Sequence, residues 1–261
     1  MKHTWIVTII LLTIFFLAQV IGLFITQHYI ETPELPLNIE RPELEEGTSF
    51  VPLFILILVA TGIAFLLAKF NLKFIWKAWF FLSIVFCITI ALNAFMGQLF
   101  AFIASIVFAF FKVIKKNIII HNIGELFIYG GLAAIFVPIF NVFSISIFLV
   151  IISIYDYIAV RKTGHMVKLA KFQTKLRLFA GILIPYGKGV AILGGGDIGL
   201  PLLFAGVVMK SYGFNALIIS FFAALSLLYL FWVADKKKFY PAMPFITAGC
   251  FLGYAVLRLF F

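Results

Sequence analysis

Three acidic residues of this sequence lie inside long apolar segments. They are Glu125, Asp156 and Asp197, whereas the other seven acids lie in an acidic stretch near the N-terminus or in a basic cluster before the last apolar segment. An ionisable side chain in apolar surroundings costs free energy and usually faces protein or water at a functional site. These three carboxyls are therefore the first candidates for proton chemistry.

Asp156 and Asp197 suit a shared reaction. Two carboxyls a few ångströms apart cannot both ionise cheaply, so they share a proton and titrate as a coupled pair. The ionised carboxyl can then take a proton from water while the protonated one polarises a peptide carbonyl, as in aspartic proteases. A proton-coupled membrane transporter would use the same side chains as a proton relay, and a non-catalytic membrane scaffold is a third interpretation.

The composition is that of a protein with several membrane spans. Of 261 residues, 64% are hydrophobic and 11% are charged, and the mean hydropathy is +1.19, far outside the range of soluble domains. The net charge of +10 does not indicate nucleic-acid binding, because the basic residues form short clusters between apolar runs, where they set topology and contact anionic lipid. Cys87 and Cys250 lie in apolar segments, so neither a disulfide framework nor a metal-ligand spacing is indicated.

The apolar runs predict an all-α polytopic membrane protein of nine transmembrane helices in a single domain, 1–261. Most runs are close to the roughly 20 residues that cross a hydrocarbon core as a helix. The spans are expected at roughly 5–26, 51–68, 78–95, 98–111, 118–138, 141–160, 189–209, 213–234 and 239–258, with boundaries that shift by several residues. An acidic loop, 27–50, follows the first span, and a basic loop, 161–177, follows the sixth.

Lysine and arginine are distributed unevenly between alternate loops. If the N-terminus is cytoplasmic, all of them except Arg41, Lys210 and Arg258 lie on the cytoplasmic side. Basic residues concentrate on that side of membrane proteins. We therefore expect a cytoplasmic N-terminus, an external C-terminus and an external acidic loop.

The two aspartates are expected at similar depth in the membrane. Asp156 lies near the cytoplasmic end of the sixth span, and Asp197 lies about two turns into the seventh, at about 1.5 Å of rise per residue. Because these spans run antiparallel, both carboxyls fall in the cytoplasmic half and can meet across a helix interface.

Three short motifs carry a family resemblance. In chain order, within 118–250, they are Tyr155-Asp156, Gly194-Gly195-Gly196-Asp197 and Pro241-Ala242-Met243-Pro244. They resemble the YD, GxGD and PAL motifs of presenilin and signal peptide peptidase, and most of all those of archaeal presenilin homologues. Met243 stands where the family usually has leucine, a swap that conserves volume. The resemblance implies an intramembrane aspartyl protease of a prokaryotic cell membrane, active in regulated intramembrane proteolysis, with Asp156 and Asp197 as its catalytic pair.

Several neighbours of the aspartates are expected to bind substrate or shape the site: Tyr155, Gly194, Gly195, Gly196, Pro201, Pro241, Ala242 and Met243. Glycine has no Cβ, so the three glycines let a substrate backbone or another helix come close, although helix packing alone would also explain them. Pro201 has no N–H to bond the carbonyl of Asp197, which loosens that helix.

The remaining site residues have open roles. Pro241 and Pro244 either start the last helix or, as the resemblance implies, shape the substrate site. Tyr155 cannot point the same way as its helical neighbour Asp156, so we expect it to pack or to form a hydrogen bond near substrate without being catalytic.

Residues 178–186 form an apolar run that is too short to span a membrane as a helix. The run is either an interfacial segment or an edge strand. A helical substrate must be extended before cleavage, and pairing with an edge strand would capture it; the resemblance implies such a use near this position. Proline at Ile182 or Ile184 is then expected to impair cleavage while leaving the protein folded.

His121 and Glu125 lie one turn apart in the fifth span, but no third ligand completes a metal site. We expect a packed or interfacial histidine, and a Glu125 that reaches for the interface from its helix end. No metal or cofactor is expected. The expected partners are transmembrane-helix proteins, as substrates, and membrane lipid. The sequence requires neither nucleic acid nor an accessory subunit, and the presenilin-like orientation implies substrates with an external N-terminus.

Overall fold

The computed structural model describes residues 4–32, 34–115, 117–162, 164, 169, 173, 178–187, 189–235 and 240–261. Most of the basic loop 161–177 lies outside these residues, as do Lys2, Lys116, Lys188 and 236–238, which contribute to the expected orientation. The predicted orientation of the chain therefore stays a prediction.

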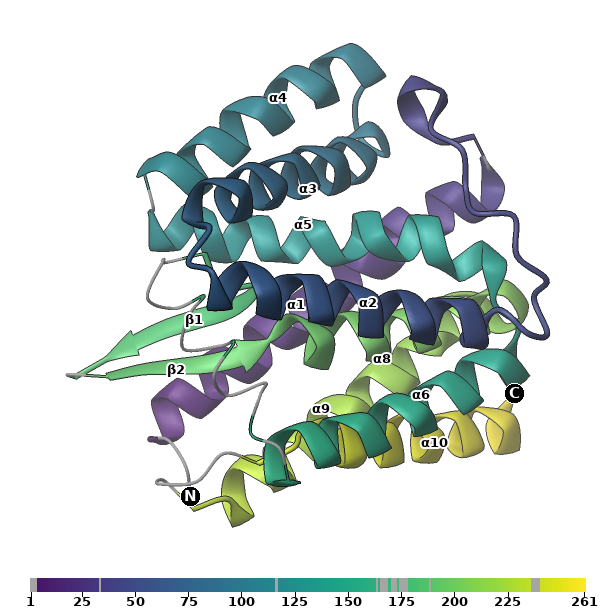
Figure 1. The fold of residues 1–261 in the computed structure, drawn as a ribbon. Helices are drawn as coiled ribbons and strands as arrows, with labels where there is room; N and C mark the ends of the chain where they lie inside the picture. The colour runs from purple at the N-terminus through teal and green to yellow at the C-terminus, as the bar shows by residue number, and fades with distance from the viewer. Residues whose placement is uncertain are drawn as a thin grey trace.

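Nine α-helices and one hairpin form the described part of the chain (Figure 1). The helices are α1 (Trp5–Glu31), α2 (Phe50–Lys69), α3 (Lys73–Asn93), α4 (Gln98–Phe110), α5 (Ile118–Phe136), α6 (Val142–Tyr157), α8 (Gly195–Tyr212), α9 (Leu217–Val233) and α10 (Met243–Phe260). The strands are β1 (Gly181–Tyr186) and β2 (Gly189–Gly194). A π-helical turn, Phe111–Lys115, continues α4, and another, Ile158–Lys162, continues α6.

Eight helical stretches of the described residues are long and apolar enough to cross a membrane. One of them, Gly195–Val233, holds both α8 and α9, which are joined by a 3-10 turn at Gly213–Ala216. The prediction of a polytopic helical membrane protein is therefore confirmed, and the predicted nine spans are near the number found. The chain is an integral membrane protein.

Several predicted boundaries were wrong. The acidic loop does not begin at residue 27, because α1 continues to Glu31. The seventh span does not begin as a helix at residue 189, because Gly189–Gly194 is strand β2 and α8 starts at Gly195. A short apolar run can form either a strand or a helix. Here Gly189–Gly194 forms a strand because it pairs with β1. The same pairing makes 181–186 a strand rather than an interfacial segment.

Local capping fixes where the helices near the site begin. The side chain of Asn117 accepts hydrogen bonds from the amides of Ile119 and Ile120 at the start of α5. Asn141 and Ser144 form a reciprocal capping box at the start of α6. These contacts satisfy backbone amides that have no partner within the helix.

Helix α8 lies at the centre of the bundle. It packs against α1, α5, α6, α9 and α10, and nearly all of its side chains between Ile198 and Met209 are buried. In Figure 1, α3 and α4 form one side of the molecule and α6, α9 and α10 the other, while the hairpin extends from the bundle beside α5 and α8. The body of α8 is therefore surrounded by other helices, whereas its first residues, Gly195–Asp197, are partly exposed.

The acidic loop is anchored to the bundle by Arg41. Its Nε donates a hydrogen bond of 3.2 Å to the carbonyl of Ala134 in α5. Burial lowers the pKa of the Arg41 guanidinium from its ordinary value.

Candidate active site

Asp156 lies in the last turn of α6 and contacts the beginning of α10. Its Oδ2 accepts a hydrogen bond of 3.1 Å from the backbone amide of Met243, which is the first residue of α10. The first amides of a helix have no partner within it and carry partial positive charge. The half-buried carboxyl of Asp156 thus caps the helix that begins with the Pro241–Pro244 motif.

A second polar contact joins the same two helices. The hydroxyls of Ser153 and Thr247 are 2.7 Å apart and buried. Ser153 precedes Asp156 by one turn of α6, and Thr247 follows Met243 by one turn of α10. Two contacts one turn apart fix both the axial position and the rotation of α6 against α10.

Asp197 lies in the first turn of α8, and not two turns into the helix as predicted. The reason is that the preceding residues form β2, and Gly194 is the extended N-cap residue between strand and helix. A carboxylate in the first turn is stabilised by the helix dipole. The Asp197 carboxyl folds back over Gly194, since its Oδ2 lies 3.1 Å from the position that a Cβ on Gly194 would occupy.

The three glycines before Asp197 have different surroundings. A Cβ on Gly195 would lie 2.9 Å from the Tyr129 hydroxyl and 3.2 Å from the carbonyl of Ala180. The amide of Gly195 donates a 3.0 Å hydrogen bond to that same carbonyl. In contrast, a Cβ on Gly196 would meet no atom within 4 Å. Close packing therefore favours glycine at 195, whereas the exposed Gly196 leaves room beside Asp197.

A side chain of α1 forms a hydrogen bond with the second turn of α8. The side-chain amide of Gln19 donates a 2.8 Å hydrogen bond to the carbonyl of Ile198 and accepts one of 3.3 Å from Ser220. Pro201, buried within α8, supplies no amide for the carbonyl of Asp197. The catalytic candidate thus lies on a helix end that side chains from other helices support.

One edge of the hairpin is closed by α5. The amide group of Asn122 donates to the carbonyl of Leu183 at 2.8 Å and accepts from its N–H at 3.0 Å. The His121 ring nitrogen Nε2 lies 2.8 Å from the carbonyl of Gly181. Both contacts use the edge of β1 that faces away from β2.

The strand register then identifies the other edge. Leu183 lies opposite Ile192, and residues opposite each other in an antiparallel pair alternate between hydrogen-bonded and non-hydrogen-bonded pairs. Because Leu183 uses its backbone groups on Asn122, the backbone groups of Ile192, and by the same alternation Val190, point to the outer edge of β2. At its end, β2 continues through Gly194 into the first turn of α8, which carries Asp197.

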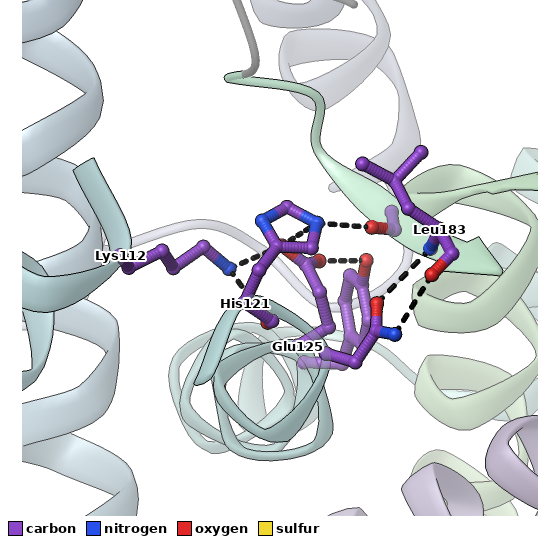
Figure 2. A network of polar contacts seen from close by, with 7 residues as sticks. Lys112, His121, Glu125 and Leu183 are labelled. Atoms are coloured by element: carbon purple, nitrogen blue, oxygen red, sulfur yellow. Dashed lines mark hydrogen bonds and ion pairs between the residues drawn. The ribbon is translucent and has the colours of Figure 1, made fainter. Parts of the chain in front are cut away.

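A buried polar network joins α5 to Lys112 after α4 and to strand β1 (Figure 2). Glu125 forms an ion pair with Lys112 and accepts a hydrogen bond from the Tyr129 hydroxyl. Only about 1% of the surface of Glu125 and of Lys112 is exposed, so two expectations were wrong. Glu125 does not reach for the interface, and Lys112 is not a loop residue. His121 is packed, and the described residues contain no group of three or more potential metal ligands.

Tyr155 lies beside Asp156 on α6 and packs against α2. Its ring makes an edge-to-face contact with Phe54, with 6.1 Å between the centroids. Sequence reasoning missed four residues that support the site region: Gln19, Lys112, Asn122 and Tyr129. A usable signal existed for α5, where polar residues recur at helical spacing in an apolar segment.

Comparisons with known proteins agree with this architecture. Residues 12–197 match a family model described as signal-peptide peptidase, presenilin aspartyl protease. A presenilin family intramembrane aspartate protease solved in space group C222 shares the fold with a TM-score of 0.67 at 16% identity, covering 97% of this chain and 98% of that chain. A structure with the same description in space group P2 gives a TM-score of 0.68 at 16% identity, covering 95% and 96%. A comparison with curated protein sequences gives no match.

Proposed function

The chain belongs to the signal-peptide peptidase and presenilin aspartyl protease family, and on that basis we propose that it hydrolyses peptide bonds within membrane-spanning segments, with Asp156 and Asp197 as the catalytic pair. The observation that carries the proposal is the hydrogen bond from Met243 to Asp156. It ties one aspartate to the start of α10, and α10 packs against both α6 and α8, the helices that carry the two aspartates.

The reaction needs one proton between the two carboxyls. The ionised carboxyl accepts a proton from water, whose oxygen attacks the carbonyl carbon of the scissile bond. The protonated carboxyl donates a hydrogen bond to the carbonyl oxygen and stabilises the negative charge that develops on it. The C–N bond then breaks, and the nitrogen leaves as an amine after taking a proton from the pair. The catalytic residues supply every proton transfer in this scheme.

Substrate is held on the outer edge of β2. A membrane helix hides its peptide bonds in its own hydrogen bonds, so the segment to be cleaved must first become extended. An extended segment that pairs with the backbone of Val190 and Ile192 adds a third strand to the hairpin. This strand runs toward Gly194 and Gly196, where the missing side chains let a peptide backbone come close to Asp197.

The chain lies in the membrane with a cytoplasmic N-terminus and an external C-terminus. The support is the concentration of lysine and arginine, with the buried Lys112 set aside, in alternate loops. With this orientation, the substrates are single-span proteins whose own N-terminus is external. Labelling of single cysteines placed in the loops tests the orientation, and modification of an N-terminal cysteine by an impermeant reagent from outside would overturn it.

The function is tested with purified protein in liposomes that also contain a single-span substrate. We expect two new fragments whose masses locate a cut inside the span. A proton-coupled transporter would instead give proton flux across the liposome membrane and no fragments. If no substrate is cut and proton flux is observed, the protein is a transporter and the protease function is wrong.

A further inference from the structure

One face of α5 carries four polar side chains in an otherwise apolar membrane helix. They are His121, Asn122, Glu125 and Tyr129. His121, Glu125 and Tyr129 follow one another at intervals of four residues, and Asn122 lies three residues before Glu125, so each is close to Glu125 on the helix surface. This face points at the hairpin (Figure 2) and, through Tyr129, at the start of α8. The catalytic scheme proposed above uses none of the four.

The Lys112–Glu125 ion pair gives this face a fixed geometry. Both side chains are buried, and taking two charges out of water is costly unless their remaining polar atoms are also bonded. Here they are bonded. Lys112 also donates a 3.3 Å hydrogen bond to the carbonyl of His121, and the second oxygen of Glu125 accepts from the Tyr129 hydroxyl. The ion pair thus sets the position of Tyr129.

Tyr129 in turn supports the turn that carries Asp197. Its hydroxyl lies 2.9 Å from the site of a Cβ on Gly195, and its ring lies 3.5 Å from the site of a Cβ on Gly199. The ring therefore lies along α8 where two glycines, one turn apart, expose the backbone. Asp197 is flanked by these two glycines along the chain.

Asn122 acts two turns earlier on the same helix. Its two hydrogen bonds to Leu183 fix the position of β1 along α5, and β2 follows through the hairpin pairing. Helix α5 therefore holds both the strand at which substrate is captured and the turn that carries Asp197.

We propose that Tyr129, oriented by the Lys112–Glu125 pair, is a positioning residue for Asp197, and that Asn122 is a positioning residue for the substrate strand. The inference rests on the protease function proposed above. Helix α5 sets how far the captured strand lies from the carboxyl that cleaves it. The two residues affect different steps, because Tyr129 supports the reacting group and Asn122 supports the surface that binds substrate.

The test compares cleavage kinetics of Tyr129→Phe and Asn122→Ala with wild type in liposomes, using one single-span substrate. Loss of precise placement costs up to about 10²-fold in rate, so we expect Tyr129→Phe to lower kcat by about tenfold with KM within about twofold. Asn122→Ala is expected to raise KM severalfold and to leave kcat nearly unchanged. Tyr254→Phe in α10, whose ring packs on Phe204, is the matched control and should leave both constants unchanged.

The positioning role of Tyr129 and the protease function are contradicted by different results. If wild type cleaves and Tyr129→Phe has the kcat of wild type, or if Tyr254→Phe loses as much, the positioning role is wrong while the protease function stands. If wild type cleaves nothing, the protease function is wrong and this inference falls with it. If Tyr129→Phe does not fold, the triple variant Lys112→Met/Glu125→Leu/Tyr129→Phe replaces it, because an apolar substitute for a buried ion pair often folds. A folded triple variant with full kcat would overturn the inference.

Discussion

The carboxyl of Asp156 accepts a 3.1 Å hydrogen bond from the backbone amide of Met243. Two sequence motifs that lie 87 residues apart thus meet through a side chain and a helix start. The Pro241–Pro244 motif therefore has a structural role. Its prolines start α10, and the free amide in the first turn of that helix binds Asp156. The strength of this helix junction can be measured at its second contact.

Ser153 and Thr247 are predicted to stabilise the junction of α6 and α10. Ser153→Ala leaves the buried Thr247 hydroxyl without this partner, which costs about 1–3 kcal/mol of unfolding free energy. The double variant Ser153→Ala/Thr247→Val removes both groups and should be close to wild type. Unfolding titrations of the wild type, the two single variants and the double variant give the coupling energy, and additive losses would show that the pair contributes nothing.

Gly195 and Gly196 are predicted to respond oppositely to alanine. A Cβ at Gly195 meets Tyr129 and the carbonyl of Ala180, so Gly195→Ala should lose about 1–3 kcal/mol of stability by overpacking. Gly196→Ala meets open space and should unfold no more easily than wild type, yet lose cleavage because the new methyl group obstructs substrate. Unfolding and cleavage are measured on both variants. Full activity of Gly196→Ala would remove the proposed substrate approach beside Asp197.

Gly131 is predicted to be essential for packing of α5 against α3. A Cβ there would lie 2.1 Å from the carbonyl oxygen of Cys87, a backbone atom that moves only with its helix. Gly131→Ala should therefore cost about 3 kcal/mol, at the upper end of overpacking losses. Gly62→Ala in α2 is the matched control, because its Cβ meets nothing within 4 Å. Equal stability of the two variants in an unfolding titration would contradict close packing of α5 against α3 at Gly131.

Proline in the hairpin is predicted to separate folding from substrate capture. The amide of Ile192 points to the outer edge of β2, where an edge strand tolerates proline, so Ile192→Pro should keep the hairpin and lose cleavage. The amide of Ile184 bonds β2, so Ile184→Pro should also open the hairpin at a cost of about 1 kcal/mol. Hydrogen exchange of the hairpin amides and cleavage rates distinguish the two effects. Wild-type cleavage by Ile192→Pro would show that substrate does not pair with this edge.

The sequence predicted most of the helices because hydropathy and length are local properties. The start of α8 could not be predicted in this way. Residues 181–186 and 189–194 are short apolar runs, and their strand structure depends on pairing with each other. That pairing moved Asp197 from the interior of a helix to its first turn.

The partners of the buried polar residues could not be predicted from the sequence either. Glu125 was expected to reach for the interface from its helix end, yet it pairs with Lys112 from the neighbouring helix segment and both are buried. Which side chains meet across helices depends on three-dimensional packing, and the hydropathy pattern of a segment does not reveal it. The catalytic pairing of Asp156 with Asp197 stays a prediction drawn from motifs and helix order.

The catalytic pair is tested most directly by cleavage rates of Asp156→Asn, Asp197→Asn and the double variant in liposomes. Asparagine keeps the shape of the side chain, and the amide oxygen that Asp156→Asn introduces can still accept the hydrogen bond from Met243, so folding should be preserved in the unfolding titration. Residues that act as one catalytic unit are strongly non-additive, so each single variant should lose about 10⁴-fold or more, and the double variant should be no slower than either. Substantial cleavage by a folded single variant, or losses that multiply in the double variant, would contradict a shared aspartate pair.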